Sequence, residues 1–278
     1  MTAAAARVPQ PGRRPGAGHA VASERLRALV PPVGAAIVVL LLWEFLLQAL
    51  GFAEFLLPRP TTIVAAFLQQ WPVLQKGIVY TGGEALAGFL VGVSLGVIAA
   101  FATARWATAR EALMPVAIAA SSIPIIAMAP ISSAWFGVES PLARIFIVTL
   151  MVFFPVMVNT VRGLTSVEAS ALELMRSYAA GDVDTFRHVR IPNALPFLFT
   201  ALRIAATLSV IGAVIGEYFG GPRYSLGIYI SSEAYLFRYP NAWAGIVCAC
   251  LIGTVFFAAV LVLERIAIPW HRGDGRDA

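Results

Sequence analysis

Residues 78–104 read IVYTGGEALAGFLVGVSLGVIAAFATA and contain a single charged side chain, that of Glu84. A helix that crosses a bilayer needs about 20 mostly apolar residues, and this stretch is long enough. Five more stretches have the same character: residues 33–52, 112–136, 142–161, 196–219 and 242–266. The sequence therefore predicts an all-α polytopic membrane protein with six transmembrane helices.

Composition supports this class, because 59% of the residues are hydrophobic and only 13% are charged. Residues 1–30 are rich in Ala, Arg, Pro and Gly and are predicted to form a disordered basic cytoplasmic tail. Residues 31–272 form the predicted transmembrane domain, and residues 273–278 form a second cytoplasmic tail. A cleaved signal peptide within residues 1–50 is the alternative. It is disfavoured because residues 43–45 (WEF) interrupt the apolar run and five further spans follow.

The distribution of Lys and Arg predicts the orientation, since short cytoplasmic loops carry the excess of these residues. With the N-terminus inside, the outer side holds only five of the 20 basic residues: Arg59, Lys76, Arg144, Arg223 and Arg238. Both termini are therefore expected in the cytoplasm of a multi-pass protein of the cell membrane. The net charge of +5 indicates contact with anionic membrane lipids, and no pattern in the chain favours nucleic acid.

A charged segment, about residues 164–195, separates the fourth span from the fifth. It includes ELMRSYAAG at 173–181 and FRHVRIP at 186–192. Charged residues alternate there with apolar ones, which is typical of a helix pair between a membrane bundle and a soluble partner. A solvated link between two spans is the alternative interpretation.

Local signals predict how this segment folds. Thr165 and Glu168 have capping-box spacing, Asp182 is placed to cap a second short helix, and Pro192 is expected to end it. Pairs three residues apart are expected to brace the two helices, and four apolar side chains remain to fill a partner's groove. The pairs are Glu173 with Arg176 and Asp184 with Arg187, and the apolar residues are Leu172, Met175, Tyr178 and Phe186.

Three glutamates lie in or beside apolar spans: Glu44, Glu84 and Glu217. A carboxylate inside a bilayer is costly and needs a partner, a proton or an interfacial position. Glu217 and Glu84 are the candidate solute-path residues, with Glu217 at or beside the outer part of the path and Glu84 about two turns into its helix. The alternative is that both pair with backbone or Arg groups for structural reasons. Glu44 is expected to be a packing or interfacial residue.

Small residues and prolines give further expectations for the spans. Glycines recur every four residues in the second and fifth spans, at Gly88, Gly92 and Gly96 and at Gly212, Gly216 and Gly220. Such stripes permit close helix contact. Packing within one subunit is favoured, and a subunit interface or a wall of the transport pathway is the alternative. Three prolines, Pro115, Pro124 and Pro130, are expected to bend the third span.

No catalytic or metal site can be assembled from this sequence, and no cofactor is expected. Cys248 and Cys250 point to nearly opposite helix faces, and the three histidines lack metal-ligand spacing. The only lysine, Lys76, is predicted outside, so the chain has no phosphate-binding GxxxxGK[ST] loop. The protein is therefore predicted not to be an enzyme and not to hydrolyse ATP itself.

The charged segment resembles the cytoplasmic signature of binding-protein-dependent importer permeases of the ATP-binding-cassette (ABC) class. That signature reads Glu-Ala-Ala, three residues, Gly, then about nine residues to an Ile/Val-x-Leu-Pro ending. Its matches are Glu173 at the Glu, Ala179 at the Gly, Phe186 at a usual aromatic position, and Val189, Ile191 and Pro192 at the ending. Two departures concern the turn: Leu174-Met175 replaces Ala-Ala, and a glycine occurs only nearby, at Gly181.

Other motifs place the resemblance in the nitrate, sulfonate, taurine and thiamine-precursor branch. These motifs are LPRP at 57–60, IP at 123–124, AP at 129–130, WFG at 135–137, FFP at 153–155, NT at 159–160 and RSY at 176–178. The stretch GEYFGG at 216–221 is more similar to permeases for pyrimidine or riboflavin-type vitamin precursors.

The resemblance implies the fold of a type I ABC importer permease and a set of partners. These are two cytoplasmic ATP-binding subunits, a second permease copy, most simply in a homodimer, and an extracytoplasmic solute-binding protein. The ATPases would grip the coupling loop through Glu173, Arg176, Tyr178, Ala179, Gly181, Phe186, Ile191 and Pro192. The predicted function is import of a small organic solute, either a vitamin precursor or a sulfonate- or nitrate-like anion. A secondary transporter that works without an ATPase is the main rival, and a structural or signalling membrane protein is a weaker one.

Overall fold

A computed structural model describes residues 17–51 and 57–270; the side chains of residues 17–29, 107 and 109 are not described. Every regular element in this part of the chain is a helix. The helices are α1 (Ala17–Leu50), α2 (Pro60–Gln69), α3 (Trp71–Arg105), α4 (Ala107–Ser121), α5 (Ile125–Phe136), α6 (Pro141–Thr165), α7 (Ala169–Ser177), α8 (Asp182–Thr185), the π-helical turn η1 (Phe186–Arg190), α9 (Ile191–Tyr218), α10 (Leu226–Tyr235) and α11 (Tyr239–Ala267).

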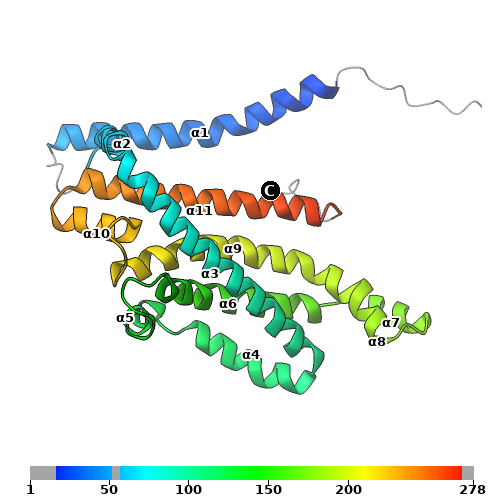
Figure 1. The fold of residues 1–278 in the computed structure, drawn as a ribbon. Coiled ribbons are helices and arrows are strands. Elements are labelled where there is room, and N and C mark those ends of the chain that lie inside the picture. Colours follow the sequence, from blue (N-terminus) through cyan, green and yellow to red (C-terminus); the bar gives the residue numbers. More distant parts are fainter. Residues whose placement is uncertain (1–16, 52–56, 271–278) are drawn as a thin grey trace, which may run out of the picture.

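The long helices run side by side, and α3 crosses them at a slant (Figure 1). Helices α7 and α8 lie at one end of the bundle, here called the loop end. Helices α2, α5 and α10 lie at the opposite end, here called the far end. Helix α1 begins and helix α11 ends at the loop end, so the first and last described helices have their outer ends on the same side of the bundle.

Five helices are long and apolar enough to cross a membrane, and a bent pair makes a sixth crossing if it counts as one span. The pair joins residues 110–121 of α4 to α5 at an angle of 89°. The break falls at Pro124, which precedes α5 in an extended conformation, while Pro115 and Pro130 are accommodated inside their helices. The predicted bend is thus concentrated at one of the three prolines, where an extended residue interrupts the helix.

Helix α6 is the centre of the bundle, because both glycine stripes pack against it. A Cβ atom at Gly88 would lie 2.5 Å from the Cβ of Val148, and one at Gly92 would lie 2.8 Å from the Cβ of Val152. On the other side, a Cβ at Gly216 would lie 2.9 Å from the Cγ of Arg144. The stripes therefore bring α3 and α9 into close contact with α6, which confirms the preference for packing within one chain.

Helix α1 is nearly separate from the bundle, since only 6% of its apolar window is buried. Glu44 attaches it to α2: its carboxylate accepts hydrogen bonds from the backbone N–H of Thr61 (3.1 Å) and from the Thr61 hydroxyl (2.8 Å). This contact satisfies orphan donors at the start of α2 and confirms a packing role for Glu44. The helix also includes residues 17–29, which were expected in the disordered tail. Residues 1–16 and 271–278 lie outside the described residues.

Candidate functional site

The charged segment begins differently from the capping-box prediction. Thr165 is the last residue of α6, and its hydroxyl donates to the backbone oxygen of Val161 at 2.9 Å. Glu168 is itself the N-cap of α7, with no side-chain capping bond. Because α6 extends to Thr165, the predicted cap residue is already used as a helical residue and cannot start the next helix. Asp182, expected as a cap, is instead the first residue of α8.

The end of α7 is a tight turn centred on Ala179, which has a φ of 51°. The N–H of Ala180 donates to the Met175 oxygen at 3.0 Å, and the N–H of Ala179 donates to the Arg176 oxygen at 2.9 Å. These two bonds define a Schellman motif, in which glycine is the usual left-handed residue. Ala179 stands where the signature of the resembling family has its glycine, so this position needs the left-handed conformation even though the residue is alanine.

The prediction that Pro192 ends a short helix is wrong. Residues 182–218 form one continuous helical run through α8, η1 and α9, and Pro192 lies in the first turn of α9. The five residues Phe186–Arg190 adopt a π-helical turn just before it. Proline removes a donor and crowds the preceding turn, and the wider π turn accommodates this without a break. From residue 182 onward, the charged segment is therefore helically continuous with the fifth span.

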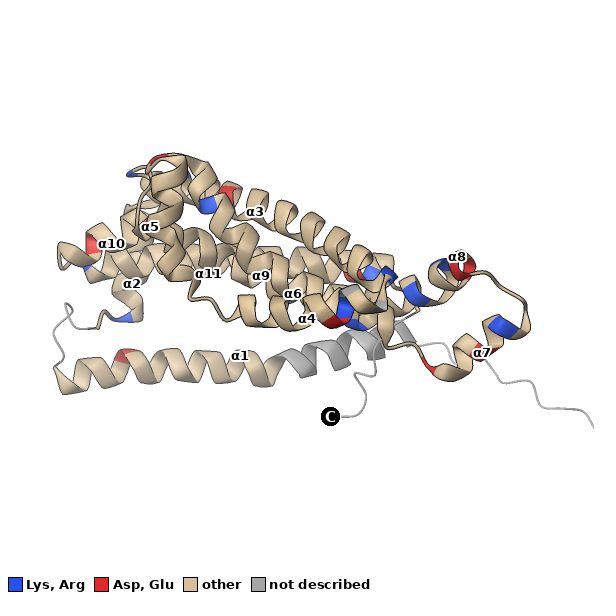
Figure 2. Cartoon of the chain, turned by 90° about the horizontal axis from the view of Figure 1, so that it is seen from below, with Lys and Arg blue, Asp and Glu red and all other residues tan. Residues whose placement is uncertain are grey.

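Helices α7 and α8 project beyond the loop end of the bundle (Figure 2). Three large apolar side chains are exposed there: Leu174 at 55%, Tyr178 at 75% and Val183 at 78%. Leu172 and Met175 are half-buried. The exposed apolar group therefore includes Leu174 and Val183, which the sequence did not single out, because exposure depends on how the turn at Ala179 orients the two helices.

Phe186 and Ile191 face the bundle instead of a partner. The Phe186 ring lies 5.8 Å from the ring of Phe101 on α3. Both residues pack with the buried Ala104, Leu164 and Ala194, and thereby anchor the loop to the ends of α3 and α6. Phe186 was expected to contact a partner; in this structure it stabilises the base of the loop.

The expected bracing ion pairs do not form in the described part of the loop. Neither Glu173 with Arg176 nor Asp184 with Arg187 comes within salt-bridge distance. The base of the loop is instead fixed by Asn193, whose side-chain amide donates to the Gly163 oxygen at 2.7 Å. This bond joins the end of α6 to the first turn of α9.

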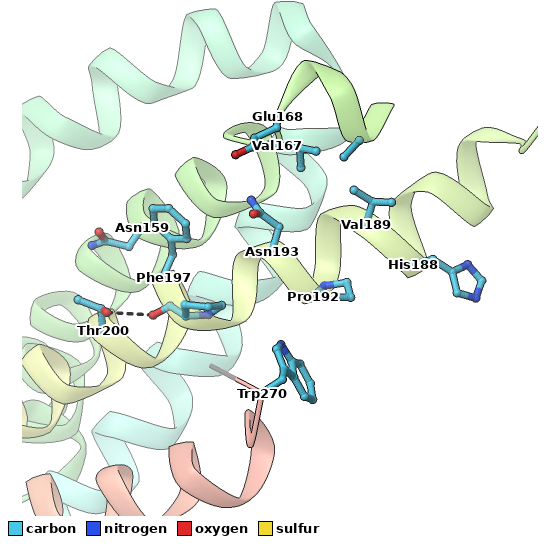
Figure 3. A pocket seen from close by; sticks show the side chains of 12 residues that line it. Asn159, Val167, Glu168, His188, Val189, Pro192, Asn193, Phe197, Thr200 and Trp270 are labelled. Atoms are coloured by element: carbon cyan, nitrogen blue, oxygen red, sulfur yellow. Dashed lines mark hydrogen bonds between the residues drawn. The ribbon is translucent and has the colours of Figure 1, made fainter. Parts of the chain in front are cut away.

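A cavity of about 760 Å³ lies between the loop and the bundle. Figure 3 shows Asn193 in the middle of its lining, Asn159 and Thr200 at one side, and Trp270 opposite Pro192. The Thr200 hydroxyl donates to the Pro196 oxygen at 2.9 Å. The cavity lies beside the contact between the end of α6 and the first turn of α9.

The far end of the bundle holds a buried charge network centred on Arg144, which is 1% exposed. Its Nε donates to both carboxylate oxygens of Glu84, at 2.8 and 3.0 Å. The two terminal nitrogens donate to the hydroxyl of Tyr80 and to three backbone oxygens, those of Val138, Glu139 and Gly220. All donors of this guanidinium are therefore used, and it joins α3, α6 and the chain segments that follow α5 and α9.

Glu217 is also fully buried, near the end of α9. One carboxylate oxygen accepts from the hydroxyl of Thr81 at 2.8 Å, and the other accepts from the backbone N–H of Gly227 at 2.6 Å. The same Thr81 oxygen accepts from the N–H of Leu226 at 3.1 Å. Glu217 therefore fastens the start of α10 to α3 and α9. Its carboxylate and the Thr81 hydroxyl each satisfy one backbone donor in the first turn of α10.

Residues 92–269 match the family described as binding-protein-dependent transport system inner membrane component. This match covers α6, the charged segment after it, α9 and α11. The chain belongs to this family. The permease is thus a membrane transport subunit and not itself an enzyme, which favours the importer over the secondary transporter that composition left open.

Three relatives of this chain are named as transport permease proteins. One relative is a formylaminopyrimidine transport permease protein of Halalkalibacterium halodurans. The two sequences are 31% identical, and the alignment covers 85% of this chain and 94% of the relative. A second relative is a riboflavin transport system permease protein of Chloroflexus aurantiacus. It is 29% identical, and the alignment covers 90% of this chain and 96% of the relative. A putative aliphatic sulfonates transport permease protein of Escherichia coli is 28% identical, with 86% of this chain and 90% of that one aligned.

A solved structure described as an amino acid ABC transporter with histidines has a similar fold. Its TM-score is 0.55 at 17% identity, and the superposition covers 71% of the permease and 95% of the solved chain. This likeness confirms the fold class of an ABC transporter permease.

The two groups of predicted site residues of the permease thus lie at opposite ends of the bundle. The predicted loop residues are spread over α7, the turn that follows it, η1 and the first turn of α9, and Glu84 and Glu217 both lie beside α3. The solute-path role of the two glutamates stays a prediction, and both residues are buried here, at 4% and 0% exposure. From the sequence, Arg144 was placed only on the outer side of the membrane, and its partner was not predicted. Its position near the start of an apolar span was the signal that it needed a buried acid.

Proposed function

We propose that the permease imports a small organic solute with energy from separate ATPase subunits, and that an ATPase docks on the exposed apolar group of Leu174, Tyr178 and Val183. The observation that carries this proposal is the exposure of these three side chains on a segment that projects beyond the bundle. Acidic and basic residues surround them, so the segment is unsuited to insertion in lipid. A complementary groove on a soluble partner accounts for both features.

The continuous helical run over residues 182–218 supports a mechanical role for the loop. A force applied at α8 acts on a single rod whose other end carries Glu217. That carboxylate is bonded to Gly227 and Thr81, so displacement of the rod also displaces α10 and α3 at the far end. Transport by alternating access requires such a link between the two ends of the bundle. The cavity beside Asn193 leaves space for the loop to pivot.

The orientation and the remaining partners belong to the same proposal. The start of α1, the end of α11 and helices α7 and α8 lie at the loop end, which we assign to the cytoplasm from the arginine distribution. The far end then faces an extracytoplasmic solute-binding protein. A second permease copy and a second ATPase complete the complex, most simply as a homodimer of permeases. The role of Glu84 and Glu217 is to hold the outer end of the solute path in shape.

For the solute we propose a heteroaromatic vitamin precursor of the pyrimidine or riboflavin type. Two of the relatives above carry such names and align over most of their length. A sulfonate is the second candidate, from the third relative. Within the fourth and fifth predicted spans, Arg144 and Arg203 are each paired with a glutamate, Glu84 and Glu264, which supports a solute without a sulfonate charge as the first candidate.

Co-purification of the ATPase tests the docking surface. Tyr178→Ala removes an exposed apolar anchor from the loop, and Tyr235→Ala is the matched control, because Tyr235 is also exposed but lies on α10 at the far end. We expect Tyr178→Ala to bind the ATPase about tenfold more weakly, the cost of an interface hot spot, and to lose import. The charged variant Ala179→Asp should behave likewise. Tyr235→Ala should retain ATPase binding, and normal ATPase binding and uptake by Tyr178→Ala would refute the docking surface.

Uptake by the reconstituted complex tests the solute class. Vesicles that contain the permease, its ATPase and its binding protein should accumulate a labelled aminopyrimidine or riboflavin in an ATP-dependent manner, and should not accumulate taurine. Accumulation of taurine alone would assign the permease to the sulfonate group.

A further inference from the structure

A second cavity at the loop end, of about 520 Å³, lies between the end of α3 and the α8–η1 segment. It is distinct from the cavity in Figure 3 and shares no lining residue with it. Its lining combines two arginines, Arg105 and Arg190, with the aromatic rings of Phe101, Trp106 and Phe186. No part of the transport mechanism above uses these arginines.

The two arginines come from different elements and converge on the same space. Arg105 is in the last turn of α3 and is exposed, and Arg190 closes η1 and is half-buried. Within the described chain neither forms an ion pair or a side-chain hydrogen bond. One acid, Asp182, also lines the cavity, so two guanidinium groups against one carboxylate leave an excess of one positive charge. Guanidinium groups bind phosphate oxygens through paired N–H donors.

An apolar path leads from this cavity into the span. Val91, Leu95, Ile98 and Ala102 are exposed and lie at helical spacing on one face of α3 that ends at Arg105. Trp106 follows, 61% exposed, as the residue that caps α3. Tryptophan at the end of a membrane helix is typical of the headgroup level of a bilayer. The cavity therefore lies where a phosphate and an acyl chain of one molecule can both be accommodated.

We propose that this cavity binds the headgroup of an anionic phospholipid, with Arg105 and Arg190 on its phosphate and an acyl chain along the Val91–Leu95–Ile98 face of α3. The bound lipid joins the end of α3 to the base of the coupling loop, beside the contact of Phe101 with Phe186. A free phosphate or an acidic protein segment would use the arginines but would leave the apolar face of α3 unexplained.

Native mass spectrometry of the purified permease with defined lipids tests the proposal without ATPase or solute. We expect retention of phosphatidylglycerol over phosphatidylcholine of the same chain length. The double variant R105Q/R190Q should bind phosphatidylglycerol about 30-fold more weakly. This is the loss expected when two arginines near an anionic membrane surface are removed. The matched control R223Q/R238Q removes two exposed arginines on either side of α10 and should change nothing.

Two further comparisons separate the possible occupants. Inorganic phosphate and glycerophosphate at millimolar concentration should fail to displace the long-chain lipid. Displacement by either would show a simple phosphate site and overturn the lipid assignment. Equal retention of phosphatidylglycerol by R105Q/R190Q and the parent chain, or equal retention of phosphatidylcholine, would also overturn it. Because this experiment measures bound lipid and not transport, a failure of the lipid proposal leaves the transport proposal unaffected. A failure of the transport proposal likewise leaves the lipid proposal unaffected.

Discussion

Arg144 and Glu84 form a buried ion pair in which the guanidinium Nε lies 2.8 Å from one carboxylate oxygen and 3.0 Å from the other. The two side chains are 1% and 3% exposed. Sixty residues separate them, so the pair fastens α6 to α3 at the far end of the bundle. Further hydrogen bonds from Arg144 to backbone oxygens explain why a charge is tolerated here, since a buried ion pair needs its remaining donors satisfied.

Removing one partner of this pair should destabilise the permease strongly. Glu84→Gln leaves the Arg144 charge buried without its counter-ion, and loss of a single buried partner typically costs about 3 to 5 kcal/mol. Thermal unfolding of the purified protein in detergent measures the effect. Glu264→Gln is the control, because its partner Arg203 lies 3.6 Å away and both side chains are partly exposed. That change should cost under about 1 kcal/mol. Equal melting temperatures for the two variants would contradict a structural role for the Arg144–Glu84 pair.

Glu217→Gln separates the charge of this residue from its shape. Glutamine can still accept from the N–H of Gly227 and can donate to the Thr81 hydroxyl. We therefore expect a stability loss of about 1 kcal/mol, the net worth of one hydrogen bond. We also expect slower uptake, because α10 is held less firmly to α9. Initial uptake rates and apparent affinity in assembled complexes provide the measurement. A normal rate with normal affinity would mean that the charge has no part in transport.

Ala179→Gly should stabilise the coupling loop. Ala179 has a φ of 51°, and the left-handed conformation costs a non-glycine residue about 1 to 2 kcal/mol. Glycine removes this cost while both hydrogen bonds of the turn remain. Slower amide exchange over residues 169–180 would report the gain, together with undiminished ATPase binding. The same substitution at the exposed Ala169, in the first turn of α7, serves as the control and should have the opposite effect, because there glycine lowers helix stability. Faster exchange in Ala179→Gly would disprove the strain.

Single cysteines test the orientation. In a variant without Cys248 and Cys250, cysteines at Ser140 and Ser232 lie beside α5–α6 and on α10, at the far end. They should react with an impermeant thiol reagent added to intact cells. A cysteine at Ser166, between α6 and α7, should react only after the cells are opened. Labelling of Ser166→Cys from outside, with Ser140→Cys protected, would reverse the orientation.

The sequence by itself determined the helical spans and the place of the charged segment between α6 and α9. A bilayer demands about 20 apolar residues for each crossing, so the spans can be read from composition alone. The loop could be located because its signature depends on local chemistry: Ala179 stands at the position that requires the left-handed turn. The preference for glycine stripes as contacts within one chain also followed from residue type, since small residues let helices approach closely.

Only the tertiary structure decided which groups meet. Glu84 was visible as an acid that needed a partner, but its pairing with Arg144 depends on how α3 crosses α6, and that crossing has no local signal. The direction of the Phe186 side chain, toward Phe101 instead of a partner, likewise depends on where α3 ends. The sequence predicted that a helix ends at Pro192, whereas the helix continues through it. The π turn that accommodates this proline depends on how the backbone packs against the bundle, and no local sequence pattern predicts it. Local patterns fix helices and turns, whereas partners distant in sequence are fixed by the packing of the whole bundle.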